Sequence, residues 1–164
     1  MNKRHILLIP LFGFLLFSGA CSWLQTDADE TAEWSANRFY SEAKKASTSG
    51  DYATAVNYFE RLQARYPFGR YAQQAQLELI YAHYKSGEAD LAIAAADRFI
   101  KAHPRHPFVD YAHYLKGLSN YDRGVGLVER VLPSDPTQTD TANSMQSFND
   151  FSELTQKFPD SQYA

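Results

Sequence analysis

Cysteine is almost absent from this chain, since Cys21 is the only one among 164 residues. A single thiol excludes any disulfide within the chain, so the fold cannot depend on such a cross-link. The thiol of Cys21 is therefore available for other chemistry.

The sequence also lacks catalytic and metal-binding motifs. It has no Gly-x-Ser-x-Gly elbow, phosphate-binding loop or His-Glu-x-x-His helix, and its carboxylates are scattered over positions that we expect to face solvent. His103 and His106 are three apart, but Pro104 interrupts the segment, so no helical face aligns the two rings. His83 and His113 each follow a Tyr-Ala pair, which we interpret as equivalent positions of a repeat. We predict a non-enzymatic protein with no cofactor and no metal.

An excess of positive charge is missing as well. The chain has 16 Lys and Arg against 19 Asp and Glu, a formal net charge of −3. This balance argues against a protein that binds nucleic acid through its phosphates.

The alternation of apolar and polar residues that marks a strand is nearly absent after Trp34. Apolar and small residues instead recur three and four positions apart, which is typical of helices that bury one face. The sequence therefore predicts an all-α fold, with helices over 32–48, 52–66, 70–86, 89–102, 108–122 and 141–157.

The N-terminus has the organisation of a secretory signal peptide. Lys3 and Arg4 precede a largely apolar run over 6–17, and the small residues 18–20 lead to Cys21. The run is too short for a comfortable permanent membrane span, so we predict a signal peptide over 1–20. Small residues directly before cysteine resemble a bacterial lipobox, although Ser18 occupies the usual leucine position. Lipidation of Cys21 is the prediction, and ordinary cleavage that leaves a free thiol is the alternative.

A lipid anchor would hold the protein at a membrane without crossing it. Each buried CH2 group contributes roughly 0.8 kcal/mol, so two or more acyl chains anchor stably. Ser22 after the cysteine resembles an outer-membrane rather than an inner-membrane address. Residues 21–31 show no clear period and are predicted to form a flexible tether.

Internal repetition is the most informative feature of the remaining sequence. Gly50 and Gly87 lie 37 residues apart, and so do Pro67 and Pro104, with a third ending at Pro159. Glycine can adopt the left-handed conformation that ends a helix, and proline cannot continue one. Each unit is thus predicted to be a helix, a tight turn, a second helix and a stop. Positions five, eleven and twelve before each proline correspond: Leu62, Phe99 and Leu154; Val56, Ile93 and Phe148; Ala55, Ala92 and Ser147.

One such hairpin cannot bury its apolar face alone, so the units must stack. The period and the spacing of Ala55, Phe59 and Pro67 after Gly50 resemble the second half of a tetratricopeptide repeat. We predict a tetratricopeptide-like helical-hairpin solenoid over 32–164. The chain stops without a polar capping repeat, so we expect it to be truncated at the C-terminus.

An insertion over 123–140 interrupts the array. It contains Gly124, Gly126, Pro133 and Pro136, which break helices, and such a long connection in a compact array is more often functional or mobile than structural.

A peptide-binding surface is predicted where the first two repeats meet, around the sequence RYPFGRYAQQAQ at 65–76. Tyrosine offers a large contact area, a hydroxyl group and little rotamer entropy to lose, which suits recognition of extended peptides. The candidate residues are Tyr66, Phe68, Arg70, Tyr71 and Gln74. For any single tyrosine, packing between helices is the alternative.

The run RYPFGRYAQQAQLELIYAHYK at 65–85, with the lipobox, the tether and the repeats, resembles the BamD family of the outer-membrane β-barrel assembly machinery. The resemblance implies a scaffold lipoprotein anchored through Cys21 at the periplasmic face of the outer membrane. It also implies binding of the barrel-forming central subunit, of accessory lipoproteins, and of the C-terminal signals of unfolded outer-membrane proteins. In that family, a tyrosine similar to Tyr66 is associated with signal recognition.

Two other functions remain open at this point. One is a generic tetratricopeptide adaptor lipoprotein for pilus or cell-wall assembly. This alternative would be favoured if the purified protein did not bring a large β-barrel subunit with it. The other is a cell-wall hydrolase, suggested only by the periplasmic address.

Overall fold

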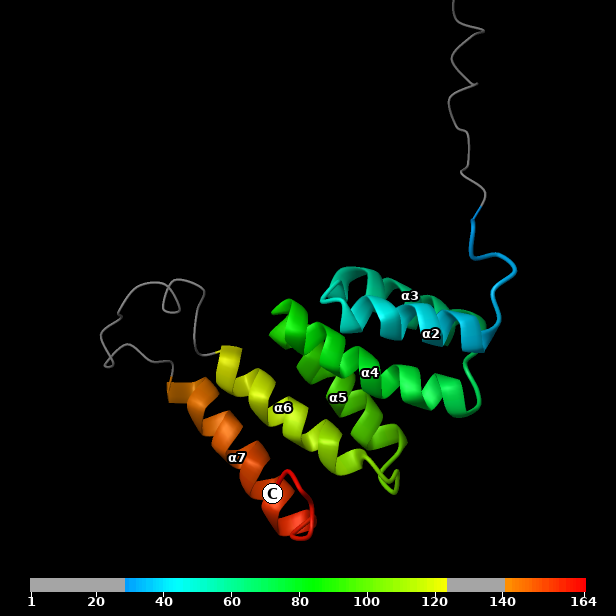
Figure 1. Cartoon of the computed structure of the whole chain (residues 1–164). Coiled ribbons are helices and arrows are strands. Elements are labelled where there is room, and N and C mark those ends of the chain that lie inside the picture. Colours follow the sequence, from blue (N-terminus) through cyan, green and yellow to red (C-terminus); the bar gives the residue numbers. More distant parts are fainter. Residues whose placement is uncertain (1–28, 124–140) are drawn as a thin grey trace, which may run out of the picture. The chain divides into compact units, whose positions relative to one another are not determined.

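The computed structural model describes residues 29–123 and 141–164, and within them it consists of helices and turns (Figure 1). The helices are α2 (Ala36–Thr48), α3 (Tyr52–Arg65), α4 (Arg70–Ser86), α5 (Ala89–Ala102), α6 (Val109–Arg123) and α7 (Thr141–Lys157). No strand occurs in the described ranges, so the predicted all-α, tetratricopeptide-like fold is confirmed. The predictions for residues 1–28, including Cys21, and for the insertion over 124–140 lie outside the described residues.

The predicted glycine turns close the first two hairpins. Gly50 and Gly87 adopt φ values of +84° and +82°, which glycine reaches without the penalty of a Cβ atom. After each glycine, a backbone N–H turns back to the preceding helix: that of Asp51 donates to Ala46 at 2.9 Å, and that of Glu88 to His83 at 2.9 Å. These paired geometries show that the two turns are copies of one helix-ending motif.

The second helix of each hairpin also ends in the same way. The backbone N–H of the residue before each proline donates to the carbonyl four positions earlier: Tyr66 to Leu62 at 2.8 Å, His103 to Phe99 at 2.8 Å, and Phe158 to Leu154 at 2.9 Å. The following proline has no N–H with which to continue the ladder. The threefold repeat inferred from the prolines is therefore present in the backbone itself.

Within residues 34–164, the helices form two layers (Figure 1). The first helices of the hairpins, α2, α4 and α6, make one layer, because α4 contacts both α2 and α6. Among the described helices, α3, α5 and α7 contact only their neighbours along the chain. Every helix of the second layer is thus held through the first layer.

The apolar side chains form two core clusters. The first joins α2, α3 and α4 around Phe39 and Phe59, and the second joins α4, α5 and α6 around Ile80 and Phe99. The small residues at the repeated position twelve before each proline, Ala55, Ala92 and Ser147, are all buried. The exposed member of the repeated set is Phe148, of which 67% is accessible to solvent.

In the third hairpin, α6 and α7 pack closely at a glycine in the middle of α6. A Cβ atom at Gly117 of α6 would lie 2.7 Å from the ring of Phe151 on α7. With any larger residue at position 117, the two helices would therefore have to move apart. Ser147 reinforces this contact, since its hydroxyl donates to the carbonyl of Gly117 at 2.9 Å. The interface of α6 and α7 is therefore built on backbone proximity more than on large apolar side chains.

Two sequence-based expectations about the fold are wrong. The first helix begins at Ala36 rather than at 32, because the Ser35 side chain caps it by accepting from the N–H of Arg38 at 3.3 Å. The expectation that carboxylates face solvent fails at Asp150, which is 3% exposed. Its partners include the Asn120 amide at 2.6 Å and the Lys116 ammonium at 3.4 Å, both on α6.

Across the described residues, no helix has both the length and the apolar character required to span a bilayer.

Candidate peptide-binding surface

The junction of the first two repeats is a short turn between α3 and α4. Tyr66 ends α3, Pro67 cannot donate a helical hydrogen bond, and Gly69 precedes α4 with a φ of +94°. A residue with a side chain would be strained at Gly69, so the sharp redirection of the chain depends on glycine. The predicted binding residues lie in this turn and on α4 directly after it.

Tyr66 is anchored within the first repeat. Its ring is half-buried against the first core cluster, and its hydroxyl donates to the carbonyl of Trp34 at 2.8 Å. The phenol therefore fixes the position of the ring with a hydrogen bond that spans 32 residues of sequence. Tyr66 is a packed residue with one accessible side, which suits a rigid contact.

Arg70 and Tyr71 form a pair at the start of α4. The guanidinium carbon of Arg70 lies 4.8 Å from the centre of the Tyr71 ring, and its Nη2 atom donates to the Tyr71 hydroxyl at 3.2 Å. Tyr71 in turn packs against Tyr40 of α2, with ring centres 5.6 Å apart. The arginine is thereby held over an aromatic surface that two helices share.

The other two predicted residues project into solvent. Phe68 is 90% exposed, and Gln74, one helical turn beyond Arg70, is exposed as well. The structure thus brings Tyr66 and Tyr71 to one core cluster and puts Arg70 on Tyr71, but it holds neither Phe68 nor Gln74 against them.

An acidic residue that the sequence analysis missed lies on the same side of α4. Glu78 accepts from the Lys44 ammonium at 2.8 Å and from the Tyr40 hydroxyl at 3.4 Å, both on α2. Burial, assisted by the Glu78 charge, raises the pKa of Tyr40 to about 12 and also raises the pKa of Tyr111 on α6. Glu78 lies one turn after Gln74, but its place at this surface depends on Lys44 and Tyr40, which are distant in the sequence.

Further aromatic contacts continue this surface onto α6. Tyr111 and Tyr114 pack against Tyr163, with ring centres 5.1 Å and 5.0 Å apart. Ser161 supports the same stretch by donating to Asp110 at 2.6 Å. The layer of α2, α4 and α6 therefore presents a series of half-buried tyrosines around one ion pair. Such a surface offers rings and hydroxyls to a ligand and shows no nucleophile paired with a base.

Two of the histidines that the structure describes have side-chain partners. Buried His83 places its Nδ1 atom 2.7 Å from Glu88, which lowers the pKa of Glu88, and the Nε2 atom of His103 lies 2.9 Å from Gln76. The interpretation of His83 and His113 as equivalent positions is wrong, because His83 lies in the last turn of α4 whereas His113 lies near the start of α6. The described residues contain no cluster of three metal-ligating side chains.

Residues 32–164 match the model of a protein family described as YfiO, outer membrane lipoprotein. The chain belongs to this family. It is 39% identical over 164 residues to the "Outer membrane protein assembly factor BamD" of Neisseria meningitidis serogroup B, a match that covers 98% of this chain and 61% of that relative. The resemblance to the BamD family inferred from the sequence is thereby confirmed.

Relatives of the same printed name occur in other bacteria. The protein from Xylella fastidiosa (strain Temecula1) is 36% identical over 98% of this chain and 54% of its own length. That from Vibrio cholerae is 37% identical over 78% of this chain and 53% of its own length. The chain thus spans little more than half to three-fifths of the length of these YfiO-family relatives. Their shared name describes assembly and no catalytic activity, in agreement with the prediction of a non-enzymatic protein.

Proposed function

We propose that the chain is a non-enzymatic scaffold lipoprotein of the outer-membrane β-barrel assembly complex. The observation that carries this proposal is the 39% identity, over 98% of the chain, to a relative named as an outer-membrane protein assembly factor. The partners are the barrel-forming central subunit, accessory lipoproteins and unfolded outer-membrane proteins. Cleavage after residue 20 and lipidation of Cys21 would attach the protein to the periplasmic face of the outer membrane.

The tyrosine-rich surface at the first repeat junction is the proposed site for the C-terminal signals of unfolded outer-membrane proteins. Tyr66 and Tyr71 supply rings that packing already holds in place, so little conformational entropy is lost on binding. Arg70, held over Tyr71, supplies a cation for the terminal carboxylate of the peptide. Gln74 supplies an exposed amide to the peptide backbone, and Phe68 supplies exposed apolar area.

The direct test measures the affinity of the full chain, purified in non-ionic detergent, for a peptide with an aromatic C-terminal residue. We expect Tyr66→Ala to weaken binding about tenfold, a free-energy change of about 1.4 kcal/mol, because the ring that contacts the peptide is lost. Tyr66→Phe retains the ring and loses only the hydroxyl that donates to Trp34, so its affinity should stay within about threefold of wild type.

A second comparison separates binding from folding. Tyr66→Ala also removes packing from the first core cluster, whereas Gln74→Ala changes an exposed side chain and should leave stability unchanged. A loss of affinity in Gln74→Ala at normal stability would support the surface directly. Equal affinities of wild type and Tyr66→Ala would remove Tyr66 from the site.

A further inference from the structure

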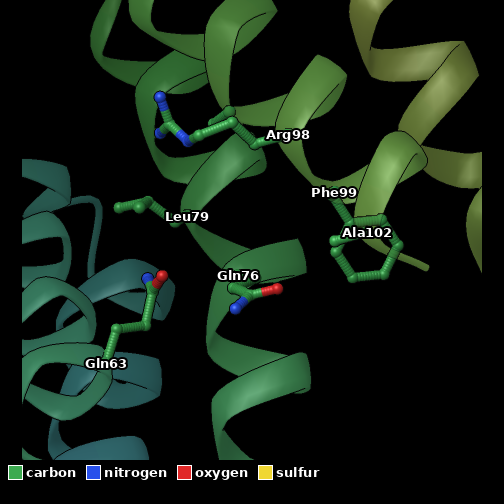
Figure 2. A pocket seen from close by; sticks show the side chains of 7 residues that line it. Gln63, Gln76, Leu79, Arg98, Phe99 and Ala102 are labelled. Atoms are coloured by element: carbon green, nitrogen blue, oxygen red, sulfur yellow. The ribbon is translucent and has the colours of Figure 1, made fainter. Parts of the chain in front are cut away.

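Two hollows lie along α5, one between α5 and α3 and one at the C-terminal end of α5. The first has a volume of about 190 Å³ and lies between α3 and α5, with α4 as its floor (Figure 2). Figure 2 shows Gln63 of α3 and Arg98 of α5 on either side of Leu79, with Gln76 on the preceding turn of α4. The gap exists because α3 and α5 contact α4 but not each other.

The second hollow lies beside the first, at the next repeat junction. It measures about 540 Å³, is lined by Gln73 of α4 and by residues 102–107, and shares Ala102 with the first hollow. The Nε2 atom of His103 lies 2.9 Å from the Gln76 amide oxygen, which ties the end of α5 to α4 where the two hollows meet. We call the two hollows together the α3–α5 channel.

The charge of this channel is opposite to that of the whole chain. Arg98 and Arg105 line it and are exposed, and neither makes an ion pair with any residue that the structure describes. No carboxylate is among the described residues that line either hollow, although the chain has a formal net charge of −3. Burial lowers the pKa of His106, so its ring is neutral near pH 7 and the arginines supply the positive charge.

The remaining lining suits an extended chain. Leu79 of α4 and Phe99 of α5 give the base of the first hollow an apolar character, although only 5% and 1% of their surfaces are exposed. Three glutamines line the channel: Gln63, Gln73 and Gln76. The Gln76 amide oxygen is engaged by His103 and the Gln63 amide nitrogen donates to Phe59, so the exposed amide of Gln73 is the one that can both donate to and accept from a peptide backbone. An apolar floor, amide walls and unpaired arginines together favour a peptide that carries carboxylates.

We propose that the α3–α5 channel binds an extended acidic segment of a partner protein, with Arg98 and Arg105 pairing its carboxylates. The first hollow is separate from the proposed signal-peptide surface, because Gln76 and Leu79 lie on the side of α4 opposite to Gln74 and Glu78, whereas Gln73 of the second hollow lies one turn from Arg70. The protein can therefore hold an acidic partner segment and an aromatic client signal at the same time.

The test uses the full chain in non-ionic detergent and a fluorescent eight-residue peptide of alternating Glu and Ala. We expect saturable binding that weakens with added salt, and a loss of about tenfold in both Arg98→Glu and Arg105→Glu. The matched control is Lys45→Glu, a charge reversal of the same size at a side chain that is 82% exposed on α2. It should change the affinity less than twofold.

A second variant tests the same channel by blocking it, without changing its charge. Ala102→Trp places a large ring at the exposed residue that both hollows share, so it should also abolish binding of the acidic peptide. Neither Arg98→Glu nor Ala102→Trp should change the affinity for the aromatic-terminated peptide, which separates this proposal from the signal-peptide surface. The proposal is overturned if the acidic peptide does not bind, if Lys45→Glu weakens it equally, or if a peptide of alternating Lys and Ala binds as well.

Discussion

Phe59→Ala is expected to lower the free energy of unfolding by about 3–5 kcal/mol, because it empties the centre of the first core cluster. Phe59 is 0% exposed and packs in the first core cluster, which also contains Ala55, Leu62 and Phe39. Its ring also lies 6.0 Å from that of Tyr40 on α2, which packs against Tyr71 of the proposed signal-peptide surface. The substitution should therefore loosen α2 as well as α3.

Urea unfolding followed by far-ultraviolet circular dichroism measures this effect. Phe68→Ala is the matched control, since the same atoms are removed from a residue that is 90% exposed. Its free energy of unfolding should stay within about 0.5 kcal/mol of wild type. Comparable losses in the two variants would contradict the assignment of Phe59 to the core.

Asp150→Ala is expected to cost about 3 kcal/mol or more, because it removes the carboxylate that joins α6 to α7. Asp150 is 3% exposed and accepts from Asn120, which is itself 2% exposed, at 2.6 Å. Its other oxygen accepts from the Gln146 amide at 3.2 Å and lies 3.4 Å from the Lys116 ammonium. Removing the carboxylate leaves the Asn120 amide buried without its acceptor.

Asp97→Ala provides the control for the same lysine. Asp97 lies 2.8 Å from the Lys116 ammonium, but its side chain is 55% exposed, so its loss should cost no more than about 1 kcal/mol. Burial favours neutral Lys116, yet the carboxylates of Asp97 and Asp150 outweigh it and raise the lysine pKa. The stabilisation is thus complete below the ordinary lysine pKa and is lost as the pH rises through the raised value. A larger loss from Asp97→Ala than from Asp150→Ala in urea unfolding would contradict this ranking.

The repeat was predictable because its signals are local. The bounds of α4, α5 and α7 agree with those expected from glycine, proline and apolar spacing. Glycine and proline end a helix at or next to their own position, so these bounds can be inferred from the local sequence. The start of α2 was misplaced, because the helical spacing continues upstream of Ser35 while the capping hydrogen bond of its side chain sets the boundary.

The missed features depend on contacts between distant segments. Nothing near Asp150 distinguishes it from an exposed carboxylate, since its burial comes from α6, which lies across the insertion in the sequence. The exposure of Phe68 and the partial burial of Tyr66, two residues apart, likewise depend on how the first repeat packs around the junction. Glu78 joins the candidate surface only because α2 brings Lys44 and Tyr40 to it.

The most direct test of the proposed client recognition varies the ligand. The affinity of the full chain in detergent is measured for a C-terminal peptide of an outer-membrane protein that ends in Phe, and for the same peptide ending in Ala. We predict that the Ala-ending peptide binds wild type about tenfold more weakly, and that Tyr66→Ala shows little further difference between the two peptides. Equal affinity of wild type for both peptides would contradict recognition of the C-terminal signal.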